Sequence, residues 1–84
     1  MVIKTPEAFI LINTEVGGET EVLNSLKNVE GVVEAYIVYG VYDLVAKIRA
    51  NSIEELKEVV TAKIRKMPKV KSTLTMIVVE SQPK

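Results

Sequence analysis

Polar groups that could bind a small molecule gather around a single glycine near the middle of the chain. The stretch runs Tyr39-Gly40-Val41-Tyr42-Asp43 and offers two phenols and a carboxylate. These groups can donate and accept hydrogen bonds, so the stretch is a candidate ligand site. A structural role fits the same residues: Asp43 could cap the turn or pair with a nearby cation, and strand tyrosines usually pack with the hydroxyl near the surface.

A second pair of hydroxyls, Thr73 and Thr75, lies towards the C-terminus. These hydroxyls could bind a ligand, although threonine is also simply a favoured strand residue. The sequence contains no His and no Cys, which excludes Ser-His-Asp and Cys-His catalysis, the usual zinc sites and disulfides. We therefore predict no catalytic residue, no metal and no cofactor. Gly17 and Gly18 lack the spacing of phosphate-binding loops, so a turn is the simpler interpretation.

Charge and hydropathy narrow the classes of partner. Lys plus Arg and Asp plus Glu each number 11, so the formal net charge is zero. This balance argues against a nucleic-acid-binding surface, which needs a basic stripe. The chain has neither an apolar run long enough for a membrane span nor a signal-peptide pattern, so we expect no membrane partner and a cytoplasmic location. The abundance of Val, Ile, Glu and Lys would suit a thermophilic source.

The hydrophobic pattern predicts the elements that must position these residues. A capping box, Ser52 with Glu55, marks the start of the second helix, and Pro68 marks its end. Gly40 alone separates two strand-like runs, which predicts an antiparallel hairpin. In chain order we predict a strand over 8–13, a helix over 19–28, strands over 32–39 and 41–50, a helix over 53–67 and a strand over 70–80.

The two halves of the chain repeat one apolar pattern. Val22, Leu26, Val29 and Val32 recur in the second half as Val60, Ile64, Met67 and Val70. Two βαβ halves joined by a hairpin give a ferredoxin-like α+β fold, βαββαβ, as one domain over residues 1–84. It has a four-stranded antiparallel sheet in the order 4-1-3-2 with two helices on one face.

The other face of this sheet is predicted to be too apolar for water. On the third strand we expect Tyr42, Leu44, Ala46, Ile48 and Ala50 to face the helices, and Val41, Asp43, Val45, Lys47 and Arg49 to face away. On the last strand we expect Thr73, Thr75, Ile77 and Val79 on this bare face. A monomer would make one face clearly polar, so we predict a homodimer packed through the sheets.

The glycine corner, preceded by Val32-x-x-Ala35-Tyr36 and followed by Val70-x-x-Thr73-x-Thr75, resembles the Lrp/AsnC ligand-binding domain, also called RAM. The resemblance covers about Ala8 to Glu80. It implies a ferredoxin-like fold, dimers formed through the sheets and often a ring of four or five dimers, an octamer or decamer. It also implies an amino acid effector bound between dimers near the corner.

Carried over by position, the ligand-binding residues are Gly40, Val41, Tyr42 and Asp43, with Thr73 and Thr75 as secondary candidates. Val41 stands where the family often has an acidic residue, which leaves open a different effector or none. Full-length relatives carry a preceding helix-turn-helix domain, which residues 1–7 cannot encode. The resemblance is thus to the stand-alone form, which implies modulation of full-length Lrp/AsnC-type regulators by mixed assembly, without direct contact to nucleic acid.

A second class of protein shares this fold and dimer. Dimeric α+β barrel enzymes, such as cofactor-free monooxygenases or small isomerases, place a His, Asn, Trp or Tyr in a roomy cavity between helices and sheet. This chain lacks His and Trp, and its helix-facing positions are aliphatic. We therefore predict a small-molecule-sensing and assembly module and keep the enzyme as the alternative.

Overall fold

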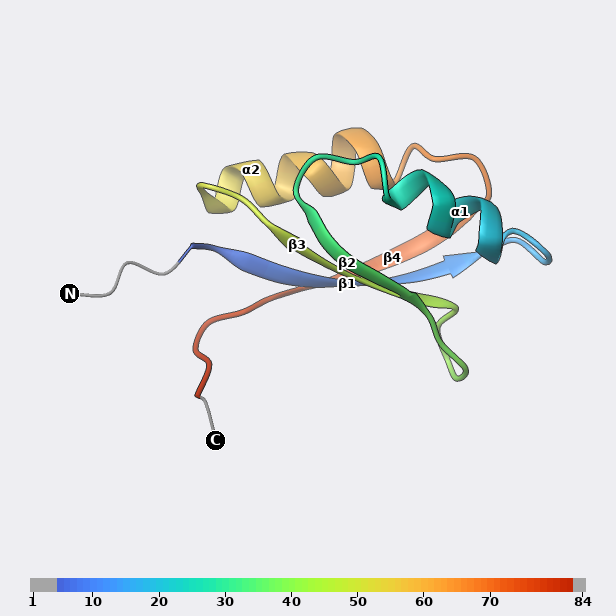
Figure 1. Cartoon of the computed structure of the whole chain (residues 1–84), viewed down its shortest axis with the longest axis horizontal. Coiled ribbons are helices and arrows are strands. Elements are labelled where there is room, and N and C mark those ends of the chain that lie inside the picture. The colour runs from blue at the N-terminus through green and yellow to red at the C-terminus, as the bar shows by residue number, and fades with distance from the viewer. Residues whose placement is uncertain (1–4, 83–84) are drawn as a thin grey trace.

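The four strands form one antiparallel sheet, and the helices cover one face of it (Figure 1). The computed structural model describes residues 5–82. The strand order is β2-β3-β1-β4, the predicted order 4-1-3-2 seen from the opposite edge, so the ferredoxin-like fold is confirmed. The elements are β1 (Glu7–Thr14), α1 (Glu19–Leu26), β2 (Val32–Ile37), β3 (Leu44–Arg49), α2 (Ile53–Glu58), the π-helix η1 (Val59–Ile64) and β4 (Val70–Ile77).

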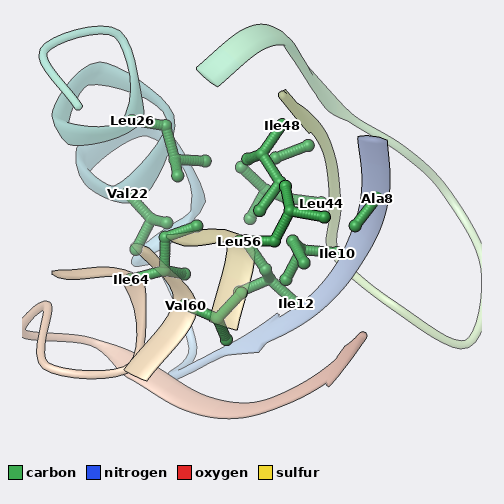
Figure 2. Packing of buried hydrophobic residues seen from close by; sticks show 11 residues of the cluster. Ala8, Ile10, Ile12, Val22, Leu26, Leu44, Ile48, Leu56, Val60 and Ile64 are labelled. Atoms are coloured by element: carbon green, nitrogen blue, oxygen red, sulfur yellow. The ribbon is translucent and has the colours of Figure 1, made fainter. Parts of the chain in front are cut away.

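The core is a single aliphatic layer between the helices and the sheet. Figure 2 shows side chains of strands and helices pointing toward one another. Every second residue of β1 and β3 takes part, which confirms the predicted helix-facing residues Leu44, Ala46 and Ile48. Each buried Val, Leu or Ile contributes about 1.5 to 3 kcal/mol. The full cluster is Ala8, Ile10, Ile12, Val22, Leu26, Leu44, Ala46, Ile48, Leu56, Val60 and Ile64.

The double glycine forms the tight turn between β1 and α1. Gly17 has a φ of +81°, which favours glycine. A Cβ on Gly18 would lie 2.8 Å from the Cβ of Lys69, so this position needs glycine for the close approach of the chain before β4. Glu19 and Glu21 then lie in the first turn of α1, where negative charge complements the helix dipole. Gly17 is thus required for its backbone angle, and Gly18 is required for close packing.

The second helix begins where its capping signal predicts but changes character midway. The Ser52 hydroxyl accepts a hydrogen bond from the Glu55 amide at 3.1 Å. From Val59 the helix widens into η1, where the Arg65 amide donates to the Val60 carbonyl at 2.8 Å. The prediction of one regular helix over 53–67 is therefore wrong in its second half.

The connection between β2 and β3 is longer than predicted. Strand pairing ends at Ile37 opposite Leu44, so residues 38–43 form a loop rather than a hairpin with Gly40 alone at its tip. Both predicted strands, over 32–39 and 41–50, are shortened accordingly. The cause lies at the loop base, where Asp43 bonds through its amide to the Ile12 carbonyl and through its carbonyl to the Val38 amide. This closes the loop with the four residues 39–42 between.

The predicted faces of β4 were reversed. Thr73, Thr75 and Ile77 lie opposite the core residues Ile12, Ile10 and Ala8 of β1, so they face the helices. Val79 lies beyond the end of the strand. Paired residues on neighbouring strands share a face, and a shift of one residue exchanges the faces. Both sets of β4 residues contain apolar side chains, so alternation within the sequence could not decide between them.

The residues that do occupy the bare face of β4 are Leu74 and Met76. They lie opposite Leu11 and Phe9 of β1, and each is nearly half exposed. The second apolar face predicted for the sheet therefore exists, with different residues from β4. Within residues 5–82, no helix has the length and apolar character needed to cross a membrane.

Candidate functional site: the glycine corner

The loop over residues 38–43 extends from the sheet on the side away from the helices (Figure 1). Its tip is unusually apolar for an exposed loop, because the Tyr39 and Val41 side chains are almost completely exposed. Gly40 has a φ of +157°, and a Cβ built there would meet no atom within 4 Å. The glycine is thus needed for its backbone angle, not for space. The loop presents apolar groups that another molecule can cover.

Asp43 stands at the base of this loop and ties it to the end of β1. Its Oδ2 accepts a hydrogen bond from the Thr14 amide at 2.8 Å and a weaker one from the Thr14 hydroxyl at 3.4 Å. Thr14 is the buried polar residue of the described chain, so these bonds satisfy groups that water does not reach. Asp43 therefore has a structural role, because its carboxylate joins the base of the loop to the end of β1. Its Oδ1 accepts no hydrogen bond from any residue within 5–82.

The other tyrosine near this stretch belongs to the sheet. Tyr36 lies on the bare face of β2, and its hydroxyl donates to Glu34 Oε2 at 2.9 Å. This hydrogen bond raises the pKa of Tyr36 above its usual value. Tyr42 is half-buried next to Asp43 in the loop. The loop therefore offers one half-buried phenol, one exposed phenol and one anchored carboxylate.

The structure does not bring Thr73 and Thr75 to the glycine corner. Thr73 lies opposite Ile12 of β1, and Ile12 in turn lies opposite Leu44 at the start of β3. Two strand spacings, roughly 10 Å, thus separate the Thr73 backbone from Leu44 beside the corner. Thr73 also faces the helices, whereas the loop extends to the other side. Within one chain, the corner residues 40–43 and the pair Thr73 and Thr75 therefore form two separate groups of candidate ligand-binding residues.

The bare face carries a charged cluster that the sequence pattern did not reveal. Arg49 Nε donates to Glu7 Oε2 at 2.8 Å, and Lys47 Nζ lies 3.9 Å from the same oxygen. The Arg49 hydrogen bond is the main cause that lowers the pKa of Glu7 below its usual value. Lys47 also lies over the Phe9 ring, 5.9 Å from its centre. Glu7 is far from both cations in sequence, so only the strand register could have revealed the cluster.

Comparison with known proteins identifies the family. A sequence model of the Lrp/AsnC ligand binding domain matches residues 7–83. The HTH-type transcriptional regulator FL11 of Pyrococcus abyssi is 40% identical over 74 residues, which cover 88% of this chain and 48% of the regulator. The chain thus spans about half the length of the curated relatives it matches. The Pyrococcus origin of this relative agrees with the thermophilic composition noted for the present chain.

Solved structures agree with this result. The crystal structure of FFRP-DM1 has a TM-score of 0.84 at 44% identity, with 88% of this chain and 99% of that chain covered. TTHA0845 from Thermus thermophilus has a TM-score of 0.89 at 33% identity, with 94% of this chain and 99% of that chain covered. These structures share the ferredoxin-like fold in which the β2–β3 loop and Asp43 lie. The chain belongs to the Lrp/AsnC ligand-binding domain family.

Proposed function

We propose that this chain is a regulatory domain that binds an amino acid at the glycine corner and assembles into oligomers. The observation that carries the proposal is the state of Asp43. Its Oδ2 is held by Thr14, and its Oδ1 is open at the base of an exposed loop. An anchored carboxylate loses little freedom on binding, which favours capture of a ligand ammonium group. The exposed Tyr39 and Val41 supply apolar contacts at the loop tip.

Val41 bears on the choice of effector. The position after the glycine is often acidic in this family, so here Asp43 is the acidic residue of the corner. One fewer negative charge weakens the attraction for an ammonium group and favours ligands with a larger apolar part. A feast or famine regulatory protein of Mycobacterium tuberculosis, solved with L-methionine, shares this fold at 22% identity and a TM-score of 0.79. L-Methionine is therefore a reasonable first ligand to test.

Assembly follows from the bare face of the sheet. Phe9, Leu11, Leu74 and Met76 form an apolar strip along β1 and β4, with the Glu7 cluster at one end. A strip of this kind is typical of a surface covered by another protein surface. We propose a homodimer through the sheets and a ring of such dimers, an octamer or decamer. A ligand that touches both the corner and Thr73 or Thr75 would then lie between two chains.

The proposed role of the assembly is to act on transcription through other chains. The curated relatives are named HTH-type transcriptional regulators, and this chain matches about half of such a protein. Mixed assembly with full-length Lrp/AsnC-type regulators would let it alter their response without contacting nucleic acid itself. A barrel enzyme, the alternative, calls for a polar-lined cavity between helices and sheet, and aliphatic side chains fill that layer here.

Calorimetric titration with the twenty amino acids, L-methionine first, combined with light scattering, tests both halves of the proposal. Asp43→Asn is the informative variant, because an amide oxygen can still accept the Thr14 hydrogen bonds while the charge is lost. We expect binding by the wild type, weaker binding by Asp43→Asn and unchanged binding by the control Glu80→Gln. Absence of binding by all twenty amino acids, together with a monomeric mass, would contradict the proposal.

A further inference from the structure

The second helix has an outer side that points away from the sheet. In Figure 1, α2 and η1 lie over the sheet, and no other described element lies over them. Their inner side carries the buried residues Leu56, Val60 and Ile64. Residues at steps of three and four positions share one side of a helix. On the outer side, such steps join four exposed residues, which we call the outer stripe: Glu55, Glu58, Ala62 and Lys66.

Charges of opposite sign are separated along this part of the chain. Residues 53–58 contain three Glu and one Lys, whereas residues 59–71 contain five cations and no acidic residue. The helix dipole favours acidic residues in the first turn, which accounts for Glu54 and Glu55. Glu58 lies beyond the first turn, where this effect has faded. The separation of charge is therefore more than helix capping requires. The five cations are Lys63, Arg65, Lys66, Lys69 and Lys71.

The two ends of the outer stripe do not neutralise each other within one chain. Glu58 and Lys66 are roughly 12 Å apart along the helix. The ion pairs described within residues 5–82 all involve Glu7. Glu58 also lines a hollow of about 570 Å³ with two further carboxylates, Glu30 and Glu55, and with Lys63 and Arg49, the latter paired with Glu7. The acidic end thus has charge and room for a cation from another molecule.

We propose that the outer stripe docks on the outer stripe of a second copy of this chain, with the two helices antiparallel and crossing at Ala62. Glu58 and Lys66 lie four residues on either side of Ala62. A two-fold axis at Ala62 therefore brings each Glu58 next to the Lys66 of the other copy, and the pair forms twice. The small Ala62 side chain permits a close approach of the two helices, roughly 8 to 10 Å between their axes.

This contact goes beyond the proposed function, because it uses neither the glycine corner nor the apolar strip. The strip lies on the face of the sheet away from the helices, and the corner extends to that same side. One copy has room for both contacts, so the helices would link sheet dimers to one another. Exposed ion pairs are weak and are screened by salt, so the helix contact should weaken as salt is raised.

A single introduced thiol tests the contact, because the chain contains no Cys. Helix axes 8 to 10 Å apart place the two crossing Cα atoms roughly 4 to 6 Å apart, within reach of a disulfide. Under mild oxidation, the full chain with Ala62→Cys should form a covalent dimer on a non-reducing gel. Glu54→Cys is the control on the same helix, since its two thiols would lie roughly 24 Å apart and should cross-link at least about tenfold more slowly.

Charge reversal tests the pairing of Glu58 with Lys66. Glu58→Lys or Lys66→Glu, each added to Ala62→Cys, should slow cross-linking about tenfold, because two attractive pairs become two repulsive ones. A mixture of these two variants should restore the rate, since opposite charges then face each other again. Glu21→Lys, added to Ala62→Cys, makes the same change of charge at an exposed residue of α1 and should leave the rate unchanged.

The outcomes separate this inference from the proposed function. Equal rates for Ala62→Cys and Glu54→Cys would indicate random collision and overturn the inference. Rates that ignore both charge reversals would also overturn it, as would cross-linking of Ala62→Cys only to a full-length regulator added to it. The titration with amino acids does not depend on any of these results. Charge-dependent cross-linking without binding of any amino acid would support the helix contact and contradict ligand binding.

Discussion

At Asp43, one carboxylate oxygen is committed to the fold and the other is open. Oδ2 accepts hydrogen bonds from the amide and the hydroxyl of Thr14, at the buried end of β1. Oδ1 has no hydrogen-bond partner within residues 5–82. The two interpretations that the sequence left open, a structural cap and a ligand contact, therefore apply to different atoms. The structural half is observed, and the ligand half stays a prediction. Asn and Ala substitutions separate the two.

Asp43→Ala should destabilise the fold by about 1 to 3 kcal/mol, because it leaves the buried Thr14 amide without an acceptor. Asp43→Asn should cost clearly less, since its amide oxygen can replace Oδ2. Urea denaturation of both variants measures the difference. Equal stability of Asp43→Ala and the wild type would show that the bonds to Thr14 contribute nothing.

Val41→Asp should raise the affinity for an amino acid roughly two- to fivefold, the gain of one exposed ion pair with the ligand ammonium group. The gain should shrink at high salt, because screening weakens exposed pairs. Val16→Asp places the same charge at an equally exposed site in the β1–α1 turn and serves as the control. A loss of affinity in Val41→Asp would instead assign Val41 to an apolar contact with the ligand.

At the scale of elements, the start of the second helix is set by a local cap, and its later π turn is set by packing against the core. Ser52 caps its N-terminus, as the capping box predicted. Further on, the fully or nearly buried residues Leu56, Val60 and Ile64 follow one another at four-residue steps. A regular helix takes 3.6 residues per turn, so such a row drifts around its axis. The wider turn of η1 keeps the row on the core, which accounts for the π-helix physically.

Ser52→Ala should lower the free energy of unfolding by about 1 kcal/mol, because the Glu55 amide loses its acceptor. Ser81→Ala, in the exposed segment after β4, should change it little. Thermal denaturation followed by circular dichroism provides the comparison. An unchanged midpoint for Ser52→Ala would mean that packing of the core face alone determines where this helix starts.

The pairing of Glu7 with Arg49 links β1 to β3 and predicts a pH dependence. The pKa of Glu7 is lowered in the folded state, so its contribution to stability is fully present above the ordinary carboxyl value of 4.5 and is lost as the pH falls through the lowered pKa. Glu7→Gln should flatten this part of the stability profile below pH 4.5. Denaturation midpoints of both proteins between neutral and acidic pH test this. Parallel profiles would contradict it.

At the scale of the whole molecule, one face of the sheet is buried by the helices, and the other face carries partly exposed apolar side chains. The β2–β3 loop and the segment after β4 both leave the sheet on this open side (Figure 1). They flank the strip of Phe9, Leu11, Leu74 and Met76. A second copy placed on the strip would bring its own loop and its own β4 edge near those of the first. Assembly and ligand binding are thus expected to be coupled.

The double substitution Leu74→Lys/Met76→Lys should convert the proposed oligomer into smaller species, because it places two charges in the centre of the apolar strip. Val16→Lys adds a charge at a fully exposed apolar residue in the β1–α1 turn, which is not part of the strip, and should leave the mass unchanged. Light scattering after size-exclusion chromatography reports the mass directly. An unchanged mass for the double variant would place the interface elsewhere on the molecule.

The sequence by itself determined the order of the elements, the helix starts, most of the aliphatic core and the position of the glycine corner. These follow from periodicity, capping and turn chemistry, which act between residues close in the chain. The tertiary structure decided the face of each β4 residue, the π turn, the length of the 38–43 loop and the partners of Asp43. Each of these depends on strand register or on packing between distant segments. For β4, a shift of one residue in the register would have exchanged the two faces.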